Sequence, residues 1–343
     1  MSASTTPIIG VTKTAPGAGN VELRERERRP VGPGEAALDV RAVGICGTDL
    51  HIWQGEYPSV PPVTMGHEVC GTVAEVGPGV DEAWLGRRVV VETYGSTCGR
   101  CRHCRDGRGN RCADRKSIGT HVDGGMAARL VLPAHNLHEV PQGLSDAAAS
   151  LAEPVACVCN SLLDPSAVQP GDAVLVIGPG PIGILAAQVA RAAGGRVAVR
   201  GTERDAARLA LAEQLGFATE VAGAGAGRDG GAPVDVVVEC SGSEPGIRHG
   251  LEALDRGGTF VLMGLRGADV TVPFDRICFS ELLVRSGFAS TPASWRHAMR
   301  LIRAGALELE ALVTDVLALT DWSRAFEAAH GGDGVKFVLD PRL

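Results

Sequence analysis

The sequence lacks any run of about 18 consecutive apolar residues, so no segment is expected to span a membrane. It also lacks a long basic run, and its formal net charge is −7 at pH 7, so nucleic acid is not expected as a partner. Residues 1–7 have neither the basic nor the apolar region of a signal peptide. We therefore predict a soluble, cytoplasmic protein that works without nucleic acid or membrane.

Aromatic residues are scarce, at 4% of the chain, whereas glycine is abundant, with 46 of 343 residues. The glycines fall in short clusters without a fixed period, which excludes a collagen-like chain and indicates many tight turns. A chain of this length exceeds what one hydrophobic core usually serves, so we expect two domains.

The sequence pattern changes near residue 141. Before it, short apolar runs such as 69–76 and 88–91 are separated by glycine and proline, which is typical of an all-β domain with functional loops. After it, an apolar strand at 173–177 precedes an amphipathic helix at 182–193, and further strand–helix pairs follow. This alternation predicts an α/β fold with a doubly wound parallel sheet.

Three segments follow from these patterns. Residues 1–160 would form the β-rich domain, residues 161–287 the doubly wound domain, and residues 288–343 a C-terminal segment. Because the chain ends in a strand-like run at 335–339, we expect this last segment to return to the first domain.

Four cysteines lie in one short loop with the spacing C-x2-C-x2-C-x7-C: Cys98, Cys101, Cys104 and Cys112. Zn²⁺ prefers four thiolates at the corners of a tetrahedron, and short spacings let one loop wrap the ion. An iron–sulfur cluster usually follows other spacings, and a disulfide suits an oxidising compartment. We predict a structural zinc without an open coordination position.

Two short polar constellations, at residues 46–51 and 66–68, lie between strand-like runs. A catalytic zinc needs three protein ligands and one position left for substrate. Cys46 and His67 supply a soft and a borderline donor, and Glu68 or Glu153 could supply the third.

A glycine-rich turn, Gly178-Pro-Gly180-Pro181-Ile182-Gly183, joins an apolar strand to a helix in the pattern G-x-G-x-x-G. The first glycine permits a tight turn, the second lets the backbone approach a pyrophosphate, and the third lets helix and strand pack closely. The helix N-terminus offers N–H groups and a partial positive charge to the phosphates. We predict that these residues, Pro181 and Ile182 included, bind a dinucleotide.

The second strand of this domain runs into the segment 201–205, where an NAD-preferring fold usually carries an acidic residue for the ribose hydroxyls. Aligned from the helix side, Glu203 takes that position and favours NAD. Aligned from the strand side, Gly201 takes it, and Thr202 with Arg204 could hold a 2′-phosphate. We favour NAD over NADP, with Glu203 and Arg204 near the ribose.

Together these motifs resemble those of the zinc-containing medium-chain dehydrogenase/reductase family, which includes sorbitol and threonine dehydrogenases. Further marks are Gly44-Ile45 before Cys46, the pair Glu153-Pro154, and the end Val335-Lys-Phe-Val-Leu-Asp-Pro341. The resemblance covers nearly the whole chain and implies a GroES-like catalytic domain and a Rossmann cofactor domain. It also implies two zinc ions per chain, one catalytic and one structural, and a homodimer or homotetramer formed through the cofactor domain.

The roles of family residues transfer where this sequence matches. Cys46 and His67 would be firm ligands of the catalytic zinc, and Glu68 would ligate it in some states and withdraw when substrate enters. Glu153 matches the glutamate of polyol dehydrogenases, whereas Cys157 falls where simple alcohol dehydrogenases carry a cysteine ligand. We favour Glu153 as the third ligand.

Three residues would handle the proton and the histidine. Asp49 would accept a hydrogen bond from His67, Thr48 would bond the substrate oxygen, and His51 would pass its proton toward solvent. The expected substrate is a small polar secondary alcohol such as a polyol, sugar, cyclitol or amino alcohol. A simple alcohol or threonine-type substrate is the alternative. A non-catalytic nucleotide-binding relative is disfavoured, because it would be free to lose these residues.

Overall fold

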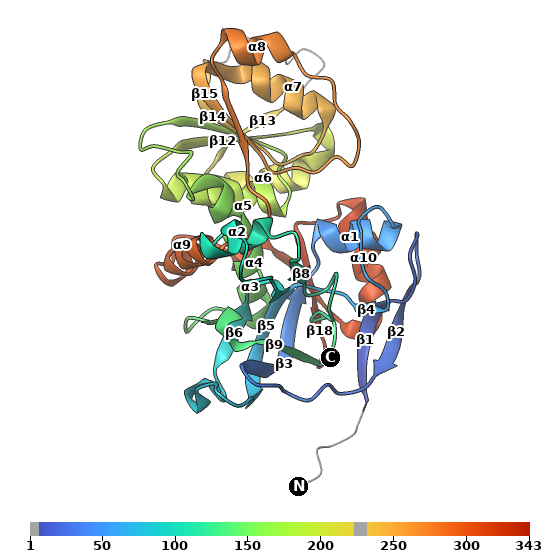
Figure 1. Cartoon of the computed structure of the whole chain (residues 1–343). Helices are drawn as coiled ribbons and strands as arrows, with labels where there is room; N and C mark the ends of the chain where they lie inside the picture. Colours follow the sequence, from blue (N-terminus) through green and yellow to red (C-terminus); the bar gives the residue numbers. More distant parts are fainter. Residues whose placement is uncertain (1–6, 223–231) are drawn as a thin grey trace. The chain divides into compact units, whose positions relative to one another are not determined.

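The computed structural model describes residues 7–222 and 232–343, so most of the segment compared above with signal peptides lies outside the described residues. The chain divides into two compact units, Met1–Glu153 with Leu312–Leu343, and Pro154–Ala311 (Figure 1). No helix within the described ranges is long and apolar enough to cross a membrane.

The first unit is built on a mostly antiparallel sheet of seven strands. In spatial order these are β10 (Leu137–Glu139), β6 (Arg88–Val91), β5 (Glu68–Val76), β3 (Glu35–Gly44), β18 (Lys336–Asp340) and β17 (Val313–Ala318), with β9 (Arg129–Pro133) also paired to β3. A smaller sheet holds β2 (Val21–Arg26), β1 (Ile8–Lys13) and β4 (Val63–Thr64), and β7 (Tyr94–Ser96) pairs with β8 (Lys116–Ser117). The β-rich texture expected from the sequence is confirmed.

Helices α1 (Gly47–Gln54) and α10 (Trp322–Gly331) pack together in this unit, and α2 (Arg102–Arg105) and α3 (Asp146–Ser150) complete it. The scarce aromatic residues gather at the α1–α10 contact: the rings of Trp53 and Phe326 lie 6.0 Å apart, edge to face. Edge-to-face pairs add stability beyond their buried area. The end of the chain is therefore packed against the helix that carries Thr48 and His51.

The C-terminal return differs in extent from the segment expected at 288–343. Strand β18 pairs with β3 in the first unit, but residues 288–311 belong to the second. Asn160 donates to the carbonyls of Phe288 and Ala289, and Thr291 donates to Asp164, so this stretch is bonded to its own unit. The division also falls after Glu153, seven residues before the expected end of the first domain at residue 160.

The second unit contains a six-stranded parallel sheet: β13 (Ala218–Val221), β12 (Arg196–Gly201), β11 (Ala173–Ile177), β14 (Val234–Glu239), β15 (Leu254–Leu262) and β16 (Leu283–Ser286). Helices α5 (Pro181–Ala192) and α6 (Ala206–Gln214) lie on one side of it, and α7 (Glu244–Ala253) and α8 (Phe274–Phe279) on the other (Figure 1). Helices α4 (Ala152–Leu162) and α9 (Pro292–Arg303) complete the described elements.

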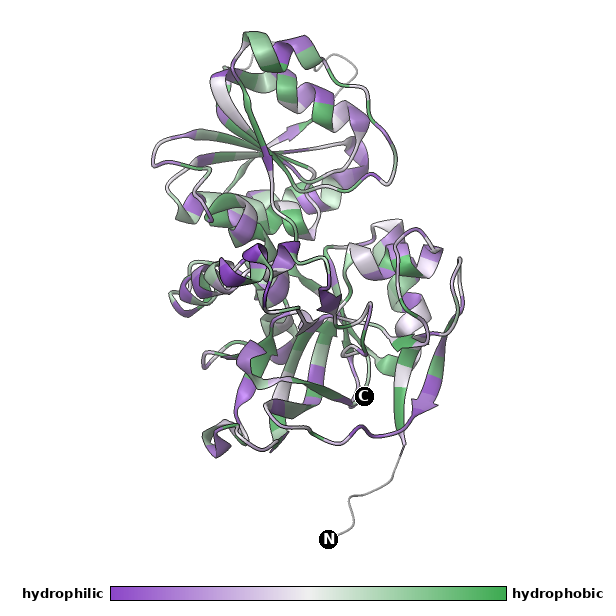
Figure 2. Ribbon diagram, in the orientation of Figure 1, coloured by the Kyte–Doolittle hydropathy of each residue, from purple (hydrophilic) through white to green (hydrophobic). Residues whose placement is uncertain are grey.

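Strands β11 and β14 are buried on both faces, as the runs Ala173–Ile177 and Val234–Glu239 require, and they are among the apolar segments in Figure 2. Chain order reverses between them, so the sheet has its switch point there. The doubly wound sheet predicted from the sequence is confirmed, and β11 has the predicted bounds.

Candidate functional site

The four cysteines of the predicted structural site lie together. Their sulfur atoms are all within 4.8 Å of one another, with 3.5 Å between those of Cys101 and Cys104. The N–H groups of Cys98 and Cys101 donate to the sulfurs of Cys112 and Cys98. Backbone N–H groups, that of Arg100 first, lower the pKa of the Cys98 thiol to about 6. A compact set of thiolates fits a closed zinc site.

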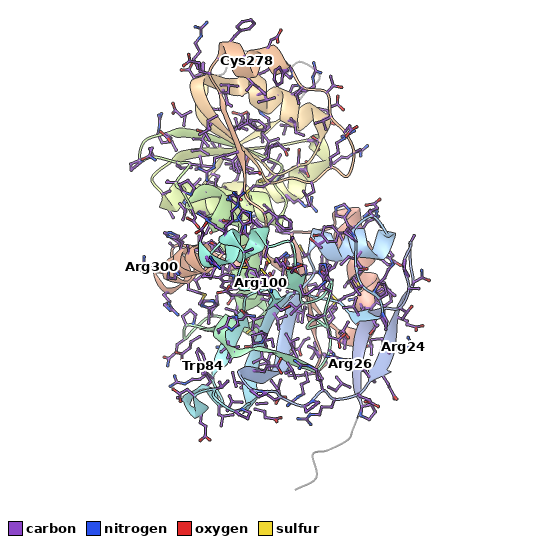
Figure 3. The ribbon with its side chains drawn as sticks, in the orientation of Figure 1. Arg24, Arg26, Trp84, Arg100, Cys278 and Arg300 are labelled. Carbon is purple, nitrogen blue, oxygen red and sulfur yellow. The ribbon has the colours of Figure 1, made fainter. Side chains whose placement is uncertain are left out.

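The loop closes because glycine turns flank its short helix. Gly99 and Gly107 have φ of 67° and 68°, a conformation that side chains rarely adopt. Arg115 lies over the ring of Tyr94 at 5.1 Å and fixes the end of the loop to β7. Arg100, labelled in Figure 3, is exposed on this loop.

A second constellation forms where α1 begins. Cys46 is the N-cap residue, and its N–H donates to Oδ2 of Asp49 at 3.0 Å. Asp49 is fully buried, and its Oδ1 lies 3.7 Å from Nδ1 of His67. That distance is longer than a hydrogen bond, and neither atom has a hydrogen-bond partner among the described residues. The structure thus brings Asp49 and His67 face to face without forming the expected bond.

Negative groups surround His67. Burial opposes a charged imidazole, but Asp49, Cys46 and Glu153 outweigh it and raise the pKa of His67 well above its ordinary value. Burial raises the pKa of Asp49. A buried histidine, a thiol and two carboxyls lie close together here. A divalent cation bound among such groups would offset their negative charge.

Glu68 has another partner in this structure. Its two oxygens accept hydrogen bonds from Nζ of Lys336 at 2.9 and 2.8 Å, and the same ammonium donates to the carbonyl of Ile45 at 2.9 Å. Glu68 and Lys336 are 1% and 2% exposed. Over residues 7–222 and 232–343, only the cysteine loop brings three or more possible ligands within 4.8 Å of one another. The side chains expected to bind the catalytic zinc therefore do not form a cluster as compact as that of the four loop cysteines.

The third ligand is contested between two residues of α4. Glu153 lies in the first turn, is 5% exposed, and acts electrostatically on His67. Cys157 follows four residues later and is partly buried. The electrostatic interaction with His67 favours Glu153 over Cys157 as the proposed third ligand.

Thr48 and His51 lie on α1, and both are half-buried. Nδ1 of His51 is 2.7 Å from Oε2 of Glu56, a partner that the sequence analysis missed. Gly55 ends the helix with φ of 77°, and the N–H of Glu56 donates to the carbonyl of His51 at 2.8 Å. A glycine four residues after a helical histidine was the available signal, because such a helix end folds the next residue back.

The glycine turn has the geometry that its spacing predicts. Gly178 follows β11 with φ of 96°, and a Cβ on Gly183 would lie 1.8 Å from the carbonyl oxygen of Gly178. A Cβ on Gly180 would meet nothing within 4 Å. Gly180 is the N-cap of α5, whose first turn holds Pro181 and Ile182. Open space beside free N–H groups at a helix N-terminus fits a pyrophosphate.

The side chains in and after the end of β12 differ in their exposure and contacts. Glu203 and Arg204 are exposed in the single-turn helix Glu203–Asp205. A Cβ on Gly201 would lie 2.9 Å from its nearest neighbour, and Thr202 donates its hydroxyl to Asp205 at 2.8 Å. Thr202 is exposed as well, but its hydroxyl is bonded to Asp205, whereas Gly201 is buried.

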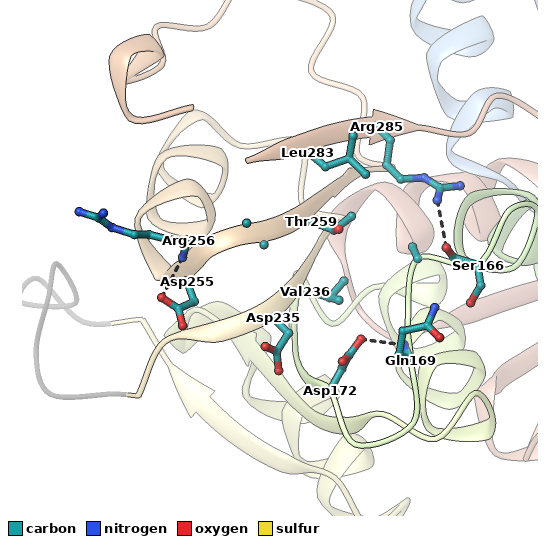
Figure 4. A pocket seen from close by; sticks show the side chains of 13 residues that line it. Ser166, Gln169, Asp172, Asp235, Val236, Asp255, Arg256, Thr259, Leu283 and Arg285 are labelled. Atoms are coloured by element: carbon teal, nitrogen blue, oxygen red, sulfur yellow. Dashed lines mark hydrogen bonds between the residues drawn. The ribbon is translucent and has the colours of Figure 1, made fainter. Parts of the chain in front are cut away.

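A cavity of about 280 Å³ lies elsewhere in the second unit (Figure 4). It is lined at the amino ends of the strands by Asp172, Asp235 and Thr259, and Arg285 donates to the carbonyl of Pro165 beside it. Ligands of open parallel sheets bind at the carboxyl ends, where the glycine turn lies. We therefore do not include this cavity in the candidate site.

The chain matches two family models in succession. Residues 32–142 match an alcohol dehydrogenase GroES-like domain, and residues 181–304 match a zinc-binding dehydrogenase. The first match covers strands and loops with the cysteine loop and the Cys46–His67 constellation, and the second begins at helix α5 of the glycine turn.

Relatives cover almost the whole chain. A sorbitol dehydrogenase of Halalkalibacterium halodurans is 34% identical over 96% of this chain and 98% of its own. A D-arabitol-phosphate dehydrogenase of Enterococcus avium is 32% identical over 96% and 97%. The crystal structure of a zinc-binding dehydrogenase of Sinorhizobium meliloti 1021, bound to NADP, has a TM-score of 0.90 and 33% identity and covers 98% of this chain and all of its own.

Alanine at Gly183 and at Gly180 should have separable effects. At Gly183 the new Cβ collides with a backbone carbonyl, so we expect a loss of about 1–3 kcal/mol in the free energy of unfolding. At Gly180 there is space, so stability should persist while dinucleotide binding weakens. Denaturant unfolding and calorimetric titration measure the two effects. Wild-type binding by Gly180→Ala, or unchanged stability of Gly183→Ala, would contradict this reading of the turn.

Proposed function

Because the chain belongs to the zinc-containing medium-chain dehydrogenase/reductase family, we propose that it is an NAD-preferring dehydrogenase of a polyol or related secondary alcohol, with a catalytic zinc on Cys46, His67 and Glu153. As a member of this family, the protein is a zinc-dependent alcohol or polyol oxidoreductase. The observation that carries the proposal is the constellation of half-buried Cys46 with buried Asp49 and His67.

The donor set fits zinc. A thiol, an imidazole and a carboxyl are ligands that catalytic zinc sites use, and three of them leave one position for substrate. Nδ1 of His67 and Oδ1 of Asp49 are buried and face each other. A modest approach of the two would fix the orientation of the ring and its tautomer, as in other metal sites.

Glu68 has the role of an exchangeable ligand in this proposal. Lys336 now holds its carboxylate, and both side chains are buried beside the segment that leads to Cys46. Glu68 would approach the metal only when this ion pair opens. The four cysteines of the loop, Cys98, Cys101, Cys104 and Cys112, would hold a second, structural zinc and take no part in the chemistry.

When bound, zinc would lower the pKa of the substrate hydroxyl as a Lewis acid, and the nicotinamide would take the hydride. Thr48 is proposed to hydrogen-bond the substrate oxygen and to pass its proton to His51. The side chain of His51 is 34% exposed, so it can release the proton to water. Glu56, 2.7 Å from Nδ1, would orient the ring for this transfer.

Two relatives support a polyol-type substrate. One is named for sorbitol and the other for D-arabitol phosphate. Both of these compounds carry secondary alcohols along a polar chain. For the cofactor, exposed Glu203 at the end of β12 supports NAD through the ribose hydroxyls. The NADP of the Sinorhizobium protein belongs to that structure, and the preference of this chain is tested below.

Replacing Cys46 with serine should abolish turnover while the fold survives. The hydroxyl is a poor substitute for a thiolate ligand, and the cysteine loop is separate. We expect the zinc content to fall from about two to about one per chain, with an unchanged melting temperature. Elemental analysis and steady-state assays check this. A Cys46→Ser protein that retains two zincs and normal activity would refute the assignment, and Cys70→Ser serves as a control outside both sites.

The substrate and cofactor are tested together. A panel of polyols, sugar alcohols, aminocyclitols, amino alcohols and simple alcohols is assayed with NAD and NADP at matched concentration. We expect the highest kcat/KM with a polyol-type alcohol and NAD, and Glu203→Ala should raise KM for NAD about tenfold without raising that for NADP. A higher kcat/KM with NADP in the wild type would overturn the NAD preference.

We also propose a homodimer formed through the second unit. Strand β16 is an edge of its sheet, and Leu283, Val284 and Phe279 are 56%, 40% and 79% exposed, with Cys278 labelled nearby in Figure 3. An exposed apolar edge strand invites pairing with a second copy. Light scattering should give a dimer or a multiple of it, and Leu283→Lys should give smaller species. A monomeric wild type would contradict the proposed dimer.

The cytoplasmic location expected from the sequence stays a prediction.

A further inference from the structure

Glu239 is a buried carboxylate that the proposed reaction does not use. It is the last residue of β14 and is 0% exposed. It lies at the carboxyl end of the sheet, on the strand next to β11, where the chain order reverses. A buried carboxylate is costly unless donors satisfy it, so its contacts indicate what it is kept for.

The carboxylate is wrapped by the segment that follows it. Oε1 accepts hydrogen bonds from the N–H of Ser241, at 2.9 Å, and from the Ser241 hydroxyl, and Oε2 accepts from the N–H of Gly242 at 3.1 Å. A Cβ on Gly264, in the loop after β15, would lie 2.7 Å from Oε2. Glu239 therefore fixes the loop that follows its own strand, β14. The loop that follows β15 packs tightly against its carboxylate.

The same loop is pressed against the glycine turn. The N–H of Cys240 donates to the carbonyl of Ile177 at 2.8 Å, at the end of β11. A Cβ on Gly178 would lie 2.8 Å from the backbone nitrogen of Ser241. Ser241 thus lies between the carboxylate of Glu239 and the first glycine of the turn. A shift of Ser241 would displace the glycine turn, which we propose receives the pyrophosphate.

The donors around Glu239 suit an ionised carboxylate. Burial raises the pKa of Glu239, and the hydroxyl and N–H donors of Ser241 and Gly242 oppose this rise without cancelling it. An ionised carboxylate accepts from all of these donors at once, whereas a protonated one would turn a donor toward another donor. Charge-assisted hydrogen bonds of this kind are stronger than neutral ones.

We propose that Glu239 is a positioning residue for the dinucleotide: it holds Ser241 and Gly242 against the Gly178 turn, so that the cofactor surface is formed before the cofactor binds. Preorganisation of this kind lowers the ordering cost of binding. The inference rests on the proposed function, in which the glycine turn binds NAD(H).

The test substitutes Glu239→Gln in the full chain and measures NADH and NADPH binding by fluorescence titration. The amide keeps the shape but replaces one acceptor oxygen by a donor. We expect Kd for NADH to rise on the order of tenfold or more, as the loss of a charge-assisted bond implies. Zinc content, and KM for the alcohol at saturating dinucleotide, should stay at wild-type values.

Two serines provide a matched pair. Ser241→Ala removes one donor to Glu239, so Kd should rise in the same direction by a smaller factor. Ser145→Ala removes the N-cap of α3 in the first unit, whose hydroxyl accepts from the N–H of Ala148 at 3.1 Å. It should lower the melting temperature and leave Kd near the wild-type value. This control separates a general loss of stability from a loss of positioning.

The outcomes are distinct. Glu239→Gln and Ser241→Ala proteins that melt earlier but bind NADH with wild-type Kd overturn this inference alone, because their effect is then only structural. A wild-type protein that binds neither NADH nor NADPH overturns the proposed function and this inference with it. A raised Kd in both variants, with wild-type Kd in Ser145→Ala, supports the positioning role.

Discussion

The buried ion pair between Glu68 and Lys336 is the contact on which the first unit depends. One ammonium joins the residue after His67 to the carbonyl before Cys46, so it holds both ligand-bearing segments at once. A Cβ on Gly44 would lie 2.1 Å from Oε2 of Glu68, which leaves this approach to glycine. Removing one partner of such a pair costs about 3–5 kcal/mol. Lys336 of β18 thus links the two segments that carry the proposed ligands Cys46 and His67.

The two predicted metal sites differ in how they are assembled. The cysteine loop closes within 15 residues, from Cys98 to Cys112, so all four sulfurs that lie within 4.8 Å of one another come from one segment. The Cys46–His67 site needs β3, β5 and the start of α1 to meet, and it needs β18 to neutralise Glu68. The local site depends on one loop, whereas the proposed exchange of Glu68 at the dispersed site depends on whether its ion pair with Lys336 opens.

What the sequence predicted follows the same division. Strand β11, the glycine turn and the cysteine loop could be predicted, because each depends on neighbours within a few residues. The Glu68–Lys336 pair could not, since its partners are 268 residues apart in the sequence. Helix α1 was not predicted either, because its short polar run has no clear apolar face, and Glu56 reaches His51 only through the left-handed Gly55.

Buried carboxyls hold segments in place in each unit, beside the proposed metal ligands in the first and beside the glycine turn in the second. Asp49, Glu68 and Glu239 are each at most 1% exposed, and each accepts a hydrogen bond from a backbone N–H or an ammonium within its own unit. Their burial would be costly without these donors, so each one fixes the segment that donates to it. Asp49 fixes Cys46, Glu68 fixes the chain end, and Glu239 fixes the loop beside the glycine turn. Thr48 and His51, which are proposed to move the proton, are only half-buried, whereas these three carboxyls, which hold backbone segments in place, are buried.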